Sequence, residues 1–187
     1  MSGYFGIGID GVSKKGNIGN LVRTANAFGA HFAFAVAACR NPLTGESPLD
    51  DFADTSKSYK AMPVYSYAAP DEVPVPADCR LVGVEMADDA VELPVFRHPH
   101  RAIYVLGAER YSLSDAMVAR CHEMITIPTR FSLNVATAGA IVMYDRMRLL
   151  GGYPDRPTMP GRRAAERPPH RHGGPISRTA AKQAGPR

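Results

Sequence analysis

The 187-residue chain predicts an α/β fold, in which helices cover both faces of a mainly parallel β-sheet. Short apolar segments typical of buried strands alternate with longer segments whose apolar residues recur every three or four positions. This alternation extends over residues 1–154 and is typical of strand–helix–strand units, whose strands run parallel. A hydrophobic fraction of 45% is enough to form a buried core.

The expected elements follow in order along this domain. Short runs rich in β-branched and aromatic residues predict strands at residues 4–9, 32–37, 64–67, 81–86, 103–106 and 124–127. Helical spacing predicts helices at residues 17–29, 50–59, 114–121 and 134–150. Gly29 fits a C-terminal cap of the first helix. Small residues of the last helix suit either packing on the sheet or a subunit interface; they are Ala136, Ala138, Gly139 and Ala140.

Residues 155–187 form a second region with a different composition. They contain 8 basic residues, 2 acidic residues and six prolines, whereas residues 1–154 contain 14 basic and 16 acidic residues. Because few large apolar side chains occur here, we expect this tail to be mostly disordered. A basic tail of this kind either contacts nucleic-acid phosphates or serves as a solubilising appendage, and the sequence leaves both readings open.

The composition also predicts a cytoplasmic protein without a membrane anchor. No apolar run approaches the roughly 18 residues needed to span a bilayer, and the N-terminus lacks the pattern of a secretory signal. The three cysteines are widely spaced and odd in number, which indicates reduced thiols. The histidine pairs His98/His100 and His170/His172 lack partners at metal-ligand spacing, so we expect no metal site.

A glycine motif near the N-terminus matches the spacing of a dinucleotide-binding loop but lacks its context. Gly6, Gly8 and Gly11 fit G-x-G-x-x-G, which in dinucleotide-binding proteins follows a strand and opens a helix. Here the glycines fall within or just after the expected strand, and no acidic residue follows at the spacing of a ribose contact. A dinucleotide-dependent oxidoreductase is therefore only a third hypothesis. No phosphate loop of the Walker type is present either.

Three short segments carry candidate chemistry, and the first lies at the start of the first helix. Asn17 is a natural N-terminal cap, because its side chain accepts hydrogen bonds from exposed backbone N–H groups. Arg23 follows six residues later and is either a surface arginine or a bidentate ligand of a phosphate.

The second and third segments follow strands. The strand at 103–106 ends at Gly107, with Glu109 two residues further on, at a place where ligands of open α/β sheets bind. The strand at 124–127 ends before a proline, and a short polar loop with Ser132 and Asn134 leads into the last helix. Taken singly, these residues are explained as turns and caps.

The joint order of the segments is more specific. N-x₅-R, then G-A-E after a strand, then I-P…S-L-N-V-A before a long helix resembles the SpoU/TrmH branch of the SPOUT RNA methyltransferases. The resemblance covers roughly residues 3–150 and includes residues 55–59 and 62–65. It implies a C-terminal trefoil knot, which general topology rules count as a rare exception. It also implies S-adenosylmethionine as the cofactor, a homodimer, and methylation of a ribose 2′-hydroxyl in tRNA or rRNA, with tRNA preferred for a compact chain.

The resemblance also assigns roles to single residues. Arg23 is expected to contact the RNA phosphate and the target hydroxyl, and Asn17 to orient it. The other expected catalytic positions are Glu109, Ser132 and Asn134. The backbone around four further residues is expected to build the cofactor pocket: Leu106, Gly107, Ile127 and Leu133. Because arginine is a poor base, we expect Arg23 to act by electrostatics and positioning.

The chain departs from the family pattern in one loop. Only Thr129, Arg130 and Phe131 lie between the Ile-Pro and Ser-Leu-Asn motifs, fewer than in many members. The shorter loop removes part of the expected pocket wall and leaves the contacts of Ile127 and Leu133 open, while Arg130 either reaches substrate or is solvated. The alternative to an active enzyme is a catalytically inactive RNA-binding module of the same fold. The complete set of motif residues favours the enzyme.

Overall fold

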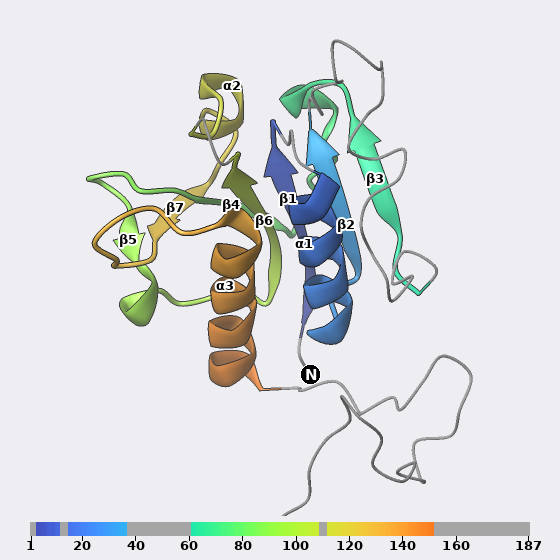
Figure 1. Cartoon of the computed structure of the whole chain (residues 1–187). Coiled ribbons are helices and arrows are strands. Elements are labelled where there is room, and N and C mark those ends of the chain that lie inside the picture. Colours follow the sequence, from blue (N-terminus) through green and yellow to red (C-terminus); the bar gives the residue numbers. More distant parts are fainter. Residues whose placement is uncertain (1–2, 12–14, 37–60, 109–111, 152–187) are drawn as a thin grey trace, which may run out of the picture. The chain divides into compact units, whose positions relative to one another are not determined.

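The β-sheet of the computed structural model, which describes residues 3–11, 15–36, 61–108 and 112–151, contains seven strands. Their order is β3-β2-β1-β6-β4-β7-β5, and each neighbouring pair is parallel (Figure 1). The parallel sheet expected from the sequence is therefore confirmed. All described residues belong to one compact unit within Met1–Pro154. The helix expected at 50–59 and the tail expected at 155–187 lie outside the described residues.

The elements have the following bounds. The strands are β1 Tyr4–Asp10, β2 Phe32–Val36, β3 Val64–Tyr67, β4 Arg80–Val84, β5 Val91–Glu92, β6 Arg101–Gly107 and β7 Glu123–Thr126. The helices are α1 Lys15–Ala27, α2 Asp115–Val118 and α3 Val135–Leu150, with two 3₁₀ turns, η2 Pro70–Glu72 and η3 Leu93–Val95. The short strand β5 was not predicted, because two residues carry no periodic pattern.

Most expected elements are present with ends that differ by a few residues. Gly29 has a φ of 74°, which is the left-handed conformation of a helix C-terminal cap. The trefoil knot is not seen in the described part of the chain and stays a prediction. Within that same part, no helix combines the length and the apolar character needed to cross a membrane.

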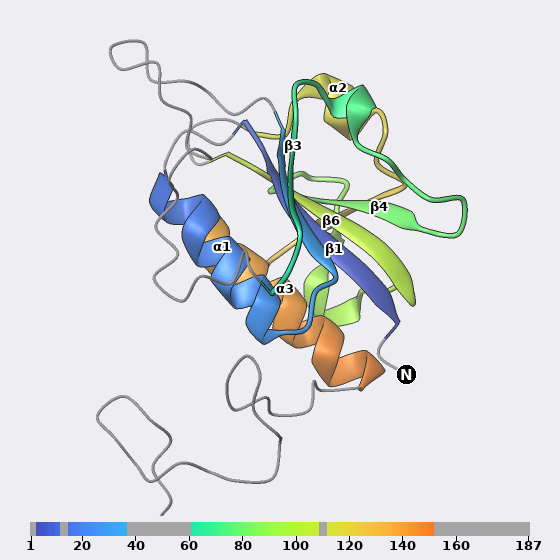
Figure 2. The ribbon, with the colours of Figure 1, turned by 90° about the vertical axis from the view of Figure 1, so that its right-hand side faces the viewer.

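Two layers of helices enclose the sheet. The helices α1 and α3 lie side by side on one face, and α2 with η2 lies toward the other face (Figures 1 and 2). Alternate strand residues supply the two cores, because successive side chains of a strand point to opposite faces. In β1, Phe5, Ile7 and Ile9 point into the core beneath α1 and α3. In β2, Phe32 and Phe34 belong to the other core.

Glycines in β1 and α3 allow close packing. A Cβ atom on Gly6 would lie 2.2 Å from the ring of Phe32, and one on Gly8 would lie 2.6 Å from the ring of Phe34. These glycines therefore make room for aromatic rings of the neighbouring strand, which explains two of the three glycines in the motif that matches a dinucleotide-binding loop. A Cβ atom on Gly139 would lie 2.5 Å from a methyl group of Leu21, so this small residue of α3 packs against α1 within the chain.

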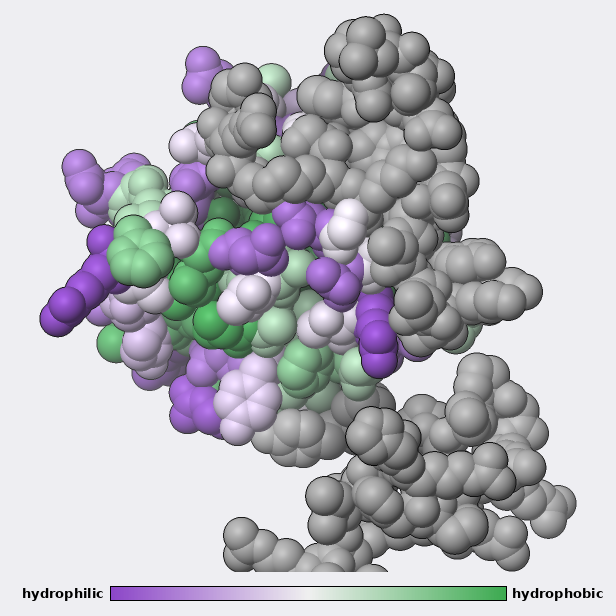
Figure 3. Space-filling model, viewed as in Figure 1, coloured by the Kyte–Doolittle hydropathy of each residue, from purple (hydrophilic) through white to green (hydrophobic). Residues whose placement is uncertain are grey.

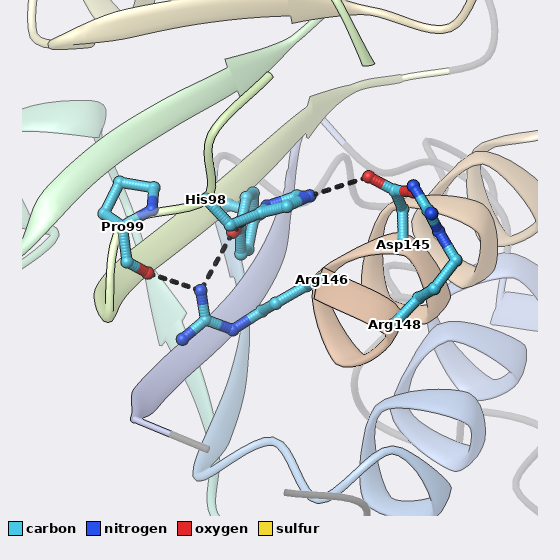
Figure 4. Close-up of polar contacts among 6 residues, drawn as sticks. His98, Pro99, Asp145, Arg146 and Arg148 are labelled. Carbon is cyan, nitrogen blue, oxygen red and sulfur yellow. Dashed lines mark hydrogen bonds and ion pairs between the residues drawn. The ribbon is translucent and has the colours of Figure 1, made fainter. Parts of the chain in front are cut away.

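A buried arginine joins the end of α3 to the start of β6. Arg146 has no exposed surface, although basic residues are rarely buried without partners. Its guanidinium donates to the carbonyl oxygen of Pro99 (Figure 4). It also donates to the carbonyl oxygen of His100 and to the hydroxyl oxygen of Tyr104. It also lies over the ring of Phe5, 5.0 Å from the ring centre. The arginine thus closes the end of the sheet remote from the carboxyl ends of the strands.

The same network fixes the protonation state of His98. Burial raises the pKa of Tyr104 to about 12, so its hydroxyl keeps its proton. Because Arg146 can only donate to the Tyr104 oxygen, the hydroxyl proton is free to point to Nδ1 of His98, 2.6 Å away. The other ring nitrogen, Nε2, then carries the proton and donates to Asp145 Oδ2 at 3.1 Å. The geometry therefore indicates a neutral His98.

We expect the stability of the protein to fall as the pH drops below about 6.5 because of His98. Burial lowers the pKa of His98 from its ordinary 6.5, and Arg146 and Arg148 lower it further, against the opposing effect of Asp145. The unfolded chain therefore takes up a proton at a pH where the folded chain resists it. The contribution of the neutral His98 to the free energy of unfolding is complete above pH 6.5, and it is lost as the pH falls from 6.5 through the lower pKa of the folded state.

Urea denaturation at about pH 7.5 and about pH 5 measures this effect. His98→Gln should be less stable than the wild type at neutral pH and should lose less further stability on acidification. The matched control is His100→Gln, since the side chain of His100 is exposed. An identical pH dependence for the wild type and His98→Gln would refute the assignment.

Candidate functional site

A pocket opens at the carboxyl ends of β4, β6 and β7, beside the first turns of α3. This edge is where ligands of open parallel sheets bind. The pocket is mostly apolar, and the space-filling view of this face shows apolar side chains gathered beside α3 (Figure 3). Its lining residues are Val84, Glu85, Met86, Leu106, Gly107, Ala108, Ile127, Thr129, Ser132, Leu133, Val135 and Ala138.

All four positions expected to contact a cofactor line this pocket: Leu106, Gly107, Ile127 and Leu133. The shortened loop therefore does not remove Ile127 or Leu133 from its wall. Gly107 is constrained from within the protein, since an added Cβ atom would lie 2.6 Å from a carboxylate oxygen of Glu85 and 2.8 Å from the backbone nitrogen of Leu113. A glycine is therefore needed here because Glu85 and Leu113 pack against it. The sequence did not reveal these neighbours.

Two of the expected catalytic residues meet directly. Asn134 donates from Nδ2 to Oδ1 of Asn17 at 3.0 Å, although the two residues are 117 positions apart. The Oδ1 atom of Asn134 accepts from the backbone nitrogens of Ala136 and Thr137, so Asn134 also caps α3. The first turns of α1 and α3 are therefore joined by a side-chain hydrogen bond. Asn17 does not cap α1 as predicted, because this helix already begins at Lys15. Asn17 is buried, and its own Nδ2 has no hydrogen-bond partner, which leaves a donor available at this junction.

The remaining expected residues lie in different surroundings. Arg23 is exposed on α1, and it forms no ion pair with any other residue that the structure describes. Ser132 is exposed and lines the pocket. Glu109 lies outside the described residues, so its expected role stays a prediction. Among the residues that the structure describes, no three His, Cys, Asp or Glu side chains are grouped to hold a metal ion.

A buried aspartate holds the N-terminal cap of α2. Asp10, at the end of β1, accepts from the backbone nitrogen of Ser114 at 2.9 Å and from its hydroxyl at 2.7 Å. The same serine caps α2, because its hydroxyl accepts from the nitrogen of Met117 at 3.3 Å. The sequence predicted a helix beginning at Ser114 but gave no role to Asp10. A carboxylate at the end of a buried strand was the available signal.

Glu85 is a second carboxylate to which the sequence gave no role. It follows β4 directly and lines the pocket. It belongs to no motif, and the strand expected at residues 81–86 included it, whereas β4 ends at Val84. Its position at the carboxyl end of a buried strand was again the signal. Met86, Thr129 and Ala138 also line the pocket without having been expected there.

Comparison with known proteins agrees with this arrangement. The model of the SpoU rRNA methylase family matches residues 5–144. A 23S rRNA (uridine(2479)-2′-O)-methyltransferase of Streptomyces viridochromogenes is 25% identical over 156 residues, which are 78% of this chain and 53% of that protein. The chain therefore spans about half the length of this curated relative.

Solved structures show the same fold. The SpoU methyltransferase AviRb of Streptomyces viridochromogenes, in complex with AdoMet, matches with a TM-score of 0.64 and 24% identity, over 78% of this chain and 60% of that one. A structure described for the 2-OH methylation of C/U34 on tRNA matches with a TM-score of 0.65 and 20% identity, over 80% of this chain and 98% of that one. The fold is thus the SPOUT fold. With the family model matching residues 5–144, the chain belongs to the SpoU rRNA methylase family.

Proposed function

We propose that the protein is an S-adenosylmethionine-dependent RNA methyltransferase that acts on a ribose 2′-hydroxyl of tRNA or rRNA. The observation that carries the proposal is the pocket at the carboxyl edge of the sheet, lined by Leu106, Gly107, Ile127 and Leu133 and adjoined by the start of α3. The family and the related rRNA 2′-O-methyltransferase support the same reaction. The cytoplasm is the proposed location.

The lining of the pocket fits S-adenosylmethionine chemically. Leu106, Ile127 and Leu133 offer an apolar surface for the adenine ring and the carbon chain. The hydroxyls of Thr129 and Ser132 supply polar partners at the same wall. When bound, the cofactor supplies a methyl group carried on a positively charged sulfur.

The chain's own residues would position the RNA and stabilise charge. Arg23 is proposed to hold the phosphate beside the target ribose and to stabilise negative charge on its oxygen, since arginine is a poor base. Asn17 and Asn134 hold the first turns of α1 and α3 together, which keeps this oxygen at a fixed place relative to the pocket. Ser132 and Glu109 complete the proposed catalytic set.

An exposed loop beside the pocket supports contact with RNA. Phe131 has 74% of its surface exposed, and the neighbouring Arg130 is exposed as well. The hydroxyl of Thr129 donates to the carbonyl oxygen of Phe131 at 2.9 Å, which shapes the loop. Exposed aromatic rings and arginines stack on unpaired bases. We propose that this loop contacts nucleotides next to the target and that the basic tail adds contacts to phosphates.

A homodimer is the proposed assembly, with the outer face of α3 at its interface. Ile141 and Tyr144 are exposed on this helix three positions apart, which places them on the same side, and the exposed Leu149 lies near the end of the helix. Gly139, by contrast, packs against α1 within the chain. Exposed large apolar side chains that share a face are typical of interaction sites.

Tyr144→Asp should weaken the dimer by at least about tenfold, because it introduces a charge into a proposed apolar interface. Sedimentation velocity at micromolar concentration measures the change. Tyr144→Phe is the matched control and should remain dimeric. A wild-type protein that sediments as a monomer would contradict the proposed assembly.

Calorimetry tests the proposed cofactor directly. S-adenosylmethionine should bind the wild-type protein, and NAD should not. Absence of S-adenosylmethionine binding together with tight RNA binding would favour the alternative, a catalytically inactive RNA-binding module of the same fold. Binding of NAD alone would instead revive the oxidoreductase hypothesis.

A further inference from the structure

The pocket contains a single charged side chain among the described residues that line it, the carboxylate of Glu85. Every other lining residue is apolar, a glycine, or a bearer of a neutral hydroxyl group. A charge beside such an apolar wall is screened less than a charge surrounded by water on all sides, although the partly buried Glu85 also meets solvent. The electrostatic character of the pocket is therefore set largely by this residue within the described part of the site.

The carboxylate is held in place by the backbone. Its Oε1 atom accepts from the nitrogen of Met86 at 2.9 Å, and its Oε2 atom accepts from the nitrogen of Leu113 at 3.0 Å. A Cβ atom on Gly107 would lie 2.6 Å from Oε2, so the glycine leaves the space that the carboxylate occupies. Two backbone N–H donors, together with the space that Gly107 leaves, thus hold the carboxylate of Glu85 at the carboxyl ends of β4 and β6.

We propose that Glu85 is a specificity-determining residue that makes the pocket prefer the cationic S-adenosylmethionine to its neutral product, S-adenosylhomocysteine. This inference rests on the proposed function. When the methyl group moves to the ribose oxygen, the sulfur keeps the electron pair of the broken bond and the hydroxyl proton leaves to solvent. The cofactor thereby loses its positive charge, and with it the attraction to Glu85. The residue favours exchange of product for fresh cofactor.

Calorimetry on the full chain with three ligands tests this charge effect. S-adenosylmethionine and sinefungin, whose amine also carries a positive charge, should bind Glu85→Gln about tenfold more weakly than the wild type, while S-adenosylhomocysteine should change less than about twofold. The charge common to the amino-acid portion of all three ligands cancels in this comparison. Asp88→Asn, which changes an exposed carboxylate beyond the pocket, is the matched control.

A second variant separates charge from structure. Glutamine can accept only one of the two backbone hydrogen bonds, whereas Glu85→Asp keeps the charge and should keep the preference for S-adenosylmethionine. Equal weakening of all three ligands in Glu85→Gln, or loss of the preference in Glu85→Asp, would overturn the inference. A wild type that binds none of the three ligands would instead refute the proposed function.

Discussion

Replacing Arg23 with alanine is expected to slow methyl transfer to RNA by about 10²–10³-fold at saturating RNA and cofactor. The reason is that a preorganised cation beside the reacting oxygen stabilises charge that develops only during the reaction. Arg23 is exposed, so its removal should leave the stability of the fold nearly unchanged. The measurement is the single-turnover rate with labelled S-adenosylmethionine.

The controls for Arg23 separate catalysis from general RNA affinity. Arg97→Ala removes another exposed arginine outside the proposed site and should keep near-normal turnover. Affinity for S-adenosylmethionine should be the same in the wild type and in Arg23→Ala. Near-normal turnover of Arg23→Ala at saturating RNA would exclude both a positioning and an electrostatic role.

Replacing Arg146 with alanine is expected to lower the free energy of unfolding by about 3 kcal/mol. The change leaves the carbonyls of Pro99 and His100 and the hydroxyl of Tyr104 without their donor and opens a cavity at a fully buried site. Urea denaturation at neutral pH measures the loss.

The neighbouring Arg148 provides a matched comparison for this loss. Its guanidinium pairs with Asp145 at 2.9 Å but is half exposed, so Arg148→Ala should cost less than about 1 kcal/mol. Similar losses for the two variants would show that burial of Arg146 contributes little to stability.

The arrangement of strands and helices follows well from the sequence where the pattern is long and periodic. α1 and α3 were predicted from the spacing of apolar residues, and both begin and end close to the expected positions. The N-terminal glycines were correctly assigned to a strand. The rings that require glycine at these positions belong to Phe32 and Phe34 in the neighbouring strand, and nothing in the local sequence indicates that they lie there.

Long-range polar contacts could not be predicted in the same way. Asn17 and Asn134 each read as a helix cap, and nothing in the local sequence indicates that they bond to each other. Arg146 resembles a surface residue of an amphipathic helix, and its burial depends on acceptors that the end of β6 supplies. Glu85 belongs to no motif, so its place in the pocket could be recognised only from the residues that surround it in the structure.

The most direct test of the proposed reaction is the chemical identity of the methylated nucleoside. The purified protein is incubated with total RNA and methyl-labelled S-adenosylmethionine, the RNA is digested to nucleosides, and the labelled products are identified by mass spectrometry. We predict label in 2′-O-methylated nucleosides and its near absence with Arg23→Ala. Label on a base, or no transfer to RNA by a protein that binds the cofactor, would contradict the proposed function.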